Sequence, residues 1–226
     1  MNDFEYNSNT KSKLTPTASG YNVIYDTEED TSPPENYRFK ALMGYLSWLS
    51  TIVRPDLQIV LTLMAGKAHK GLSKSDINAC RHLLKYLAGT ETLGLTYHAN
   101  EALLNKLVAF SDASYDSGNA SAVGSFVIML NGAAVSWRSW KIKKICTSVA
   151  EAEVTALFEA AKRVTQLRNL IKEFGFDQDR LSTPIFCDSQ IAITPYAKLI
   201  ALRNDPITTL FTSTTSKKQW HMEQFT

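Results

Sequence analysis

The sequence predicts a mixed α/β domain that follows a small helical unit. Residues 37–90 carry apolar side chains at helical spacing, whereas short apolar strands and one long amphipathic helix follow from Leu107 on. The order of strand, hairpin, helix and strand is typical of one sheet with helices packed against it. We therefore expect an irregular tail over residues 1–36, a helical unit over 37–100 and an α/β domain over 104–226.

The helical unit is predicted from the spacing of its apolar residues and from what precedes them. The tail is polar and is interrupted by helix-breaking residues, namely Pro16, Gly20, Pro33 and Pro34. From Tyr37 on, apolar residues recur with the helical period on both sides of Arg54-Pro55-Asp56. A third helix is expected over about residues 75–87, with Ser73 or Ser75 as its cap and Gly89 at its end.

The strands of the α/β domain are predicted from short apolar runs and one turn. Residues 107–111 form the first run, and residues 123–130 and 133–139 flank Asn131-Gly132, a strong hairpin signal. A long helix is expected over about 149–174 because Gly175 is a typical helix end. A strand over 184–186 and a further helix to about Leu202 complete the pattern.

Two aspartates follow predicted strands, Asp112 after the first and Asp188 after the last. If these strands are parallel neighbours joined by the long helix, both carboxylates emerge at the same edge of the sheet, where ligands bind in open α/β sheets. Asp188 also has a simpler interpretation, because an aspartate in this position often caps the next helix. The positions of the acidic residues in the long helix distinguish a ligand-binding role of Asp188 from a capping role.

The long helix offers Glu151 and Glu153, and helical phase separates them. Its apolar stripe consists of Ala156, Leu157, Ala160, Ala161, Val164 and Ile171. At about 100° per residue, Glu153 falls near the middle of this stripe and Glu151 lies about 160° away. Ser148-Val149-Ala150-Glu151 matches a capping box, which explains Glu151. A carboxylate on a core face needs a partner, so Glu153 either shares a cation with Asp112 and Asp188 or pairs with a nearby Arg or Lys.

The residue types around these carboxylates indicate which ion would fit. Three carboxylates without nearby His or Cys ligands favour a hard ion such as Mg²⁺ or Mn²⁺. A pair of such ions suits phosphodiester hydrolysis. The three cysteines, Cys80, Cys146 and Cys187, are far apart and odd in number, which favours core positions in a protein of a reducing compartment over a disulfide framework or a zinc site.

Four segments occur in the order of a known nuclease core: Phe110-Ser111-Asp112-Ala113, Ser136-Trp137-Arg138-Ser139, Ser148-Val149-Ala150-Glu151-Ala152-Glu153 and Cys187-Asp188-Ser189-Gln190. With the upstream helical unit, they resemble the connection and ribonuclease H region of Ty1/copia-type LTR retrotransposon Pol polyproteins, over roughly residues 37–195. The resemblance implies a ribonuclease H-like mixed sheet with flanking helices. It also implies that Asp112, Glu153 and Asp188 are the catalytic acids and metal ligands.

The resemblance further implies an activity and its partners. The expected reaction is hydrolysis of the RNA strand of an RNA–DNA hybrid by a two-metal-ion mechanism, with Mg²⁺ or Mn²⁺ as cofactor. Ser189 and Gln190 would begin the helix that approaches the nucleic acid. The reverse transcriptase part of the same polyprotein is a further expected partner, and the expected location is a cytoplasmic virus-like particle or the nucleus. No membrane partner is expected, because no apolar run reaches the roughly 18 residues of a membrane span.

This sequence departs from the family pattern at several positions. Ser114 stands where the family usually has Asp, and Val154 where it has Tyr. A fourth acid has no clear match near the end of the chain, where the stand-ins are Asp205, His221 and Glu223. The paired aspartates of a polymerase palm are absent from the sequence. The alternative to an active nuclease is therefore a catalytically degenerate transposon remnant that keeps the fold and at most binds nucleic acid.

A basic stretch precedes the long helix. Arg138, Lys141, Lys143 and Lys144 lie beside Trp137 and Trp140, although the whole chain has a formal net charge of only +2. These residues form either a solvated edge of the hairpin or a rim that contacts phosphates and positions a duplex. A hybrid would be recognised there by its backbone shape and 2′-hydroxyl groups.

Overall fold

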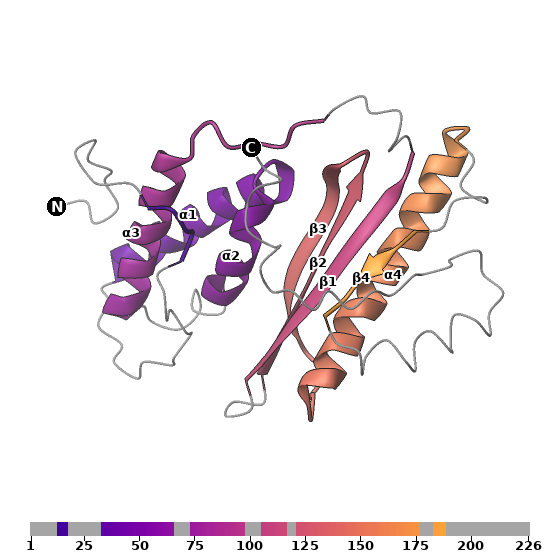
Figure 1. Ribbon diagram of the computed structural model, residues 1–226. Helices are drawn as coiled ribbons and strands as arrows, with labels where there is room; N and C mark the ends of the chain where they lie inside the picture. The colour runs from indigo at the N-terminus through magenta and orange to yellow at the C-terminus, as the bar shows by residue number, and fades with distance from the viewer. Residues whose placement is uncertain are drawn as a thin grey trace. The chain divides into compact units, whose positions relative to one another are not determined.

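The computed structural model describes residues 13–17, 33–65, 73–97, 105–116, 121–176 and 183–188. The chain divides into two compact units, Met1–Gly94 and Leu95–Thr226 (Figure 1). Each unit has its own hydrophobic core, and the two cores share no residue. In the described part of the chain, no helix is long and apolar enough to cross a membrane.

The first unit is helical. Its elements are α1 (Pro33–Ile52), a 3-10 helix η1 (Pro55–Leu57), α2 (Gln58–Ala65) and α3 (Lys74–Gly89). Helix α1 begins at Pro33, earlier than the expected start at Tyr37. The expectation that Pro33 and Pro34 interrupt the chain before the helix is therefore wrong, because proline is favoured in a first helical turn, where its missing N–H has no partner to lose.

Polar groups fix the turns of the helical unit. The guanidinium of Arg54 is buried and donates to Asp56 Oδ2 at 2.8 Å and to the carbonyl of Thr90 at 3.0 Å, and the hydroxyl of Tyr86 donates to the same Asp56 oxygen at 2.8 Å. Ser73 is the N-cap of α3, in a reciprocal capping box with Asp76. The contacts of Arg54 and Asp56 thus connect their turn with the end of α3, whereas the capping box fixes its start.

The second unit is a mixed α/β unit with one four-stranded sheet. Its elements are β1 (Leu107–Asp116), β2 (Ser121–Leu130), β3 (Ala133–Ile142), α4 (Val149–Glu173) and β4 (Ile185–Phe186). The strand order is β3-β2-β1-β4, in which β1 pairs antiparallel with β2 and parallel with β4. The predicted fold class, a ribonuclease H-like mixed sheet with flanking helices, is confirmed. The predicted hairpin turn is also confirmed, with positive φ angles of 54° at Asn131 and 85° at Gly132.

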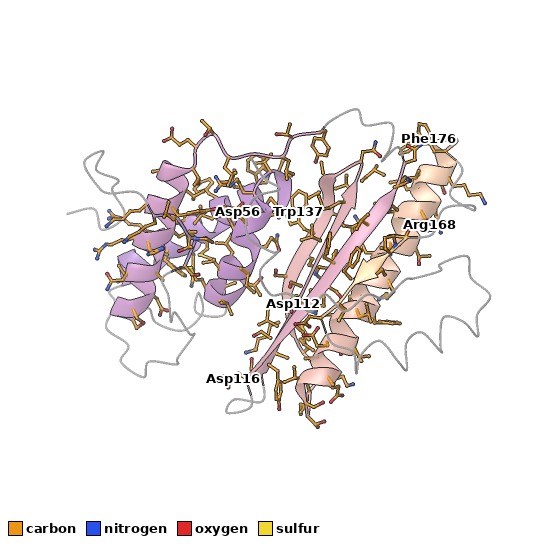
Figure 2. The ribbon with its side chains drawn as sticks, viewed as in Figure 1. Asp56, Asp112, Asp116, Trp137, Arg168 and Phe176 are labelled. Carbon is orange, nitrogen blue, oxygen red and sulfur yellow. The ribbon has the colours of Figure 1, made fainter. Side chains whose placement is uncertain are left out.

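Helix α4 packs against β1 and β2 and covers one face of the sheet (Figure 1). The core between them combines buried residues of the helix and the strands, including Leu157, Ala160 and Val164 with Ala109, Ile128 and Ile185. In the C-terminal part of α4, the buried Arg168 (Figure 2) donates to Oγ1 of Thr183 at 3.0 Å. Thr183 lies just before β4. The helix therefore holds β4 against β1 as well as covering the sheet.

The strand that carries Asp112 is longer than the sequence predicts. Asp112 lies within β1 and not at its end, because β2 continues to pair with β1 as far as Ser121 opposite Asp116. The neighbour on the other side is short, since the β1–β4 pairing stops at Phe110 and Phe186. Asp112 thus lies beyond the paired part of β4, at a position where that side of β1 has no strand neighbour among the described residues.

Candidate metal centre

Glu153 is a buried carboxyl group on the sheet-facing side of α4. Only 3% of Glu153 is exposed, and it belongs to the buried face that also contains Ala156 and Leu157. The backbone N–H of Ala113 donates to Glu153 Oε1 at 3.2 Å, and the Cys187 thiol lies 3.7 Å from Oε2. The helical-phase prediction for Glu153 is therefore confirmed, whereas its role as a metal ligand stays a prediction.

The charges around Glu153 favour its protonated form. Burial raises the pKa of Glu153 to about 7, and the negative charges of Asp112 and Asp188 add to the increase. The hydrogen bonds from Ala113 and Cys187 act in the opposite direction. The pKa of Asp112 is also raised, first by loss of hydration and then by the charge of Asp188. The three acids therefore lie within electrostatic reach of one another, with an excess of negative charge.

The ligand atoms that come closest together are not the three carboxylates. One atom each from Glu153, Cys187 and Asp188 lies within 4.8 Å of the others, and Asp112 is not in this group among the residues that the structure describes. Glu153 and Cys187 are buried, whereas Asp188 is exposed. Figure 2 shows Asp112 on β1 beside the N-terminal half of α4, where Glu153 also lies. Cys187 is thus a neighbour of Glu153, which the sequence pattern does not indicate.

Glu151 has a capping role that differs in detail from the predicted box. Ser148 is the N-cap of α4, and its Oγ accepts from the backbone N–H of Glu151 at 3.2 Å. The Glu151 carboxylate accepts from the N–H of Thr147 at 2.8 Å and from its hydroxyl at 3.0 Å, and it also pairs with Lys144. In a capping box the Glu151 carboxylate would accept from the N–H of the N-cap Ser148, but here it accepts from the preceding residue, Thr147.

The alternative partner for Glu153 was a basic side chain. Within the ranges described above, no Arg or Lys forms an ion pair with Glu153. Arg54 pairs with Asp56, Lys144 with Glu151 and Lys162 with Glu159. Glu153 therefore has one backbone amide and one thiol as hydrogen-bond donors, and two acidic neighbours. A group of carboxylates without a counter-charge fits a divalent cation.

The basic stretch is divided between two roles. Lys144 is occupied by Glu151, an interaction that also raises the pKa of Lys144. Arg138 is exposed on β3 and lies over the ring of Trp140, at 5.2 Å from the ring centre. Lys141 and Lys143 are exposed at the end of β3 and just after it. The predicted contact of these four residues with nucleic acid stays a prediction.

Arg138 also borders a pocket between β3 and α4. The pocket has a volume of about 330 Å³, and its lining includes Trp137, Lys162 and Arg163. Arg163 Nε donates to Ser136 Oγ at 2.9 Å across this pocket, which joins the helix to the edge strand. The positive side chains of β3 thus continue onto the middle of α4, a feature that the sequence pattern around residues 138–144 does not indicate.

Several predicted site residues lie outside the described part of the chain. They are Ser189 and Gln190, the expected helix to Leu202, and the three stand-ins for a fourth acid, Asp205, His221 and Glu223. The structure therefore describes the three predicted metal ligands, Asp112, Glu153 and Asp188, but none of the candidates for a fourth acid.

Comparisons with known proteins found relatives but no matching family model. The chain is 30% identical over 135 residues to the secreted RxLR effector protein 161 of Plasmopara viticola, an alignment that covers 59% of this chain and 93% of that protein. It is 28% identical over 163 residues to the retrovirus-related Pol polyprotein from transposon RE2 of Arabidopsis thaliana, across 70% of this chain. It is 29% identical over 175 residues to the transposon Ty1-JR2 Gag-Pol polyprotein of Saccharomyces cerevisiae, across 75% of this chain. The matched regions are 11% and 10% of these two polyproteins.

Proposed function

We propose that the α/β unit of this chain, a retrotransposon Pol fragment of the Ty1/copia type, is a ribonuclease H-like nuclease. The proposed reaction is hydrolysis of the RNA strand of an RNA–DNA hybrid. The observation that carries this proposal is the buried Glu153. Its pKa is raised first by burial and then by the charges of Asp112 and Asp188, and no basic group among the described residues pairs with it.

We assign Asp112, Glu153 and Asp188 as the residues that would hold Mg²⁺ or Mn²⁺. Their carboxylate oxygens support this, because a bound cation offsets both the burial and the acidic charges that favour the protonated form of Glu153. When bound, a pair of such ions would activate the attacking water and stabilise the leaving oxygen. The reaction therefore requires all three acids in their ionised form.

The remaining residues orient the acids and the substrate. The Ala113 N–H fixes one oxygen of Glu153 relative to β1, and the capped first turn of α4 fixes where that helix begins. Arg138, Lys141 and Lys143 would contact the phosphates of the duplex and set its position. Ser189 and Gln190 are proposed as further contacts to the nucleic acid. The reverse transcriptase part of a Pol polyprotein, which makes such hybrids, is the partner we propose, in a cytoplasmic virus-like particle or in the nucleus.

The test is cleavage of an end-labelled RNA–DNA hybrid by the full chain. We expect slow cleavage in Mg²⁺ and faster cleavage in Mn²⁺, because three acids without an identified fourth hold the second ion weakly and Mn²⁺ binds nitrogen and oxygen ligands more tightly. Asp112→Asn should abolish the activity, since it removes a charge at nearly constant shape. Glu159→Gln is the matched control, because Glu159 pairs with Lys162 on α4 at 3.1 Å.

The second candidate is a degenerate remnant that binds nucleic acid without cleaving it. It is favoured by the ion-sized group of ligand atoms, which contains Cys187 in place of Asp112. Hybrid binding without cleavage in either metal would select this candidate. Cleavage that survives Asp112→Asn would instead discard the assignment of the metal ligands.

A further inference from the structure

We propose that Glu153, Cys187 and Asp188 form a binding site for a thiophilic divalent ion such as Zn²⁺ or Cd²⁺, and that this ion inhibits the nuclease by occupying two of its acids. The binding part of the proposal stands on the geometry alone, whereas the inhibition rests on the proposed function. Mg²⁺ and Mn²⁺ favour oxygen ligands, but a thiolate beside two carboxylates favours the softer ions.

The spacing of the ligand atoms suits a tetrahedral site. A sulfur at about 2.3 Å and an oxygen at about 2.1 Å from one zinc ion are about 3.6 Å apart at the tetrahedral angle. The Cys187 sulfur lies 3.7 Å from Glu153 Oε2, and one ligand atom of Asp188 lies within 4.8 Å of both other residues. An ion can therefore join the three residues with only small movements of their side chains.

The strands place a further polar group on this side of the sheet. Ala109 and Phe110 pair with Ile185 and Phe186, so the next residues along the two strands are Ser111 and Cys187. Ser111 is 97% buried, and its hydroxyl has no hydrogen-bond partner among the described residues. It lies between Ala109, which shares the core with Cys187, and Ala113, whose N–H donates to Glu153.

A buried hydroxyl without a partner is costly, and a metal-bound ligand would provide one. Ligands of metal ions usually accept or donate such second hydrogen bonds, which fix their orientation. Ser111 is therefore an observation independent of the acidic cluster and of the cysteine, and it points to a ligand at the same place.

The binding step involves a proton but no oxidation or reduction. Without the ion, the Cys187 thiol donates its hydrogen to Glu153. When the ion binds, the sulfur–hydrogen bond breaks, the proton passes to solvent, and a sulfur–metal bond forms. Asp188 is exposed, so the ion can enter from the solvent side of this residue. A soft ion held here withdraws Glu153 and Asp188 from the proposed magnesium site.

The experiment is a titration of the full chain with Cd²⁺, followed by the ultraviolet charge-transfer absorption of a thiolate–cadmium bond. We expect a band that saturates at one ion per chain in the unchanged protein and that is absent in Cys187→Ser, which lacks the thiolate. Cys146→Ser is the matched control, because Cys146 is equally buried but lies beside the carbonyl of Lys144. A band that persists in Cys187→Ser, or that disappears in Cys146→Ser, overturns the site.

A second variant covers the case in which Cys187→Ser does not fold, which circular dichroism would reveal. Asp188→Asn changes an exposed residue, and it should also weaken cadmium binding at least tenfold. An unchanged affinity in Asp188→Asn would overturn the three-residue site.

Hybrid cleavage in Mg²⁺ or Mn²⁺ with added Zn²⁺ separates this inference from the proposed function. If the band requires Cys187 but no metal supports cleavage, the soft-ion site is correct and the proposed nuclease is wrong. If the chain cleaves hybrid but shows no band that depends on Cys187, only the soft-ion site is wrong. If both hold, the zinc concentration for half inhibition should be at least tenfold higher in Cys187→Ser than in the unchanged chain, each measured against its own zinc-free rate.

Discussion

A carboxyl group that is buried beside two other acids keeps its proton more readily than it would in water, and Glu153 is in this position. Its pKa of about 7 lies above the ordinary value of 4.5, first because of burial and then because of Asp112 and Asp188. The folded protein therefore takes up a proton at Glu153 between these two values, where the unfolded chain has already released it. The cost of ionising Glu153 at neutral pH is the free energy that a bound cation would offset.

This excess of bound protons predicts how stability changes with pH. Without divalent ions, the free energy of unfolding should fall as pH rises from about 4.5 to about 7, because the folded state binds the additional proton. Glu153→Gln should reduce this fall by an amount on the order of 2 kcal/mol, since the amide does not ionise. Urea unfolding of both proteins across this pH range, with a chelator present, measures the difference. Equal slopes in the two proteins would show that Glu153 ionises normally in the folded chain.

At the scale of the helix, the first turn of α4 combines a cap with a charge pair. Ser148 caps the helix, and Glu151 binds Thr147 and Lys144. A negative charge in the first turn also interacts favourably with the helix dipole. The pKa of Glu151 is lowered to about 2, first by the hydrogen bond with Lys144 and then by those with Thr147. Glu151 therefore stabilises the folded state in its ionised form.

We expect Glu151→Ala to lower the melting temperature at neutral pH by about 2–4 °C, as the loss of a typical cap does in a chain of this size. The lowered pKa means that this contribution is fully present above about 4.5 and is lost as pH falls towards about 2. Thermal unfolding at several pH values tests both statements. Glu159→Ala, which removes only the surface pair with Lys162, should change the melting temperature less. A difference from the unchanged chain that grows on acidification would contradict the assignment.

Local patterns predicted the residues whose position depends on one element. The phase of α4 placed Glu153 on the buried face, and Asn131-Gly132 located the hairpin turn. Where two elements meet, the sequence alone was not sufficient. The continuation of β1 past Asp112 depends on its pairing with β2, whose early residues have few strong apolar signals. The contact of Cys187 with Glu153 joins positions 34 residues apart on two elements, so no local pattern in the sequence indicates it.

At the scale of the whole molecule, charge is distributed unevenly even though it nearly balances. The formal net charge is +2, which gives little general attraction for a polyanion. The exposed positive residues Arg138, Lys141 and Lys143 are concentrated on β3 and directly after it. If the α/β unit binds a hybrid, its affinity should depend on this local group and not on the number of lysines in the chain.

The salt dependence of hybrid binding tests whether this local group makes the phosphate contacts. Each phosphate contact releases counterions, so the logarithm of affinity falls with the logarithm of salt concentration by nearly one unit of slope per contact. The double variant Lys141→Gln/Lys143→Gln should weaken hybrid binding and reduce this slope by about 1 to 2. The matched control is Lys40→Gln/Lys85→Gln, which removes the same charge from α1 and α3 of the helical unit. Fluorescence anisotropy with a labelled hybrid at several salt concentrations gives both slopes. Equal losses in the two variants would mean that binding follows net charge, and that the end of β3 is only a solvated edge of the sheet.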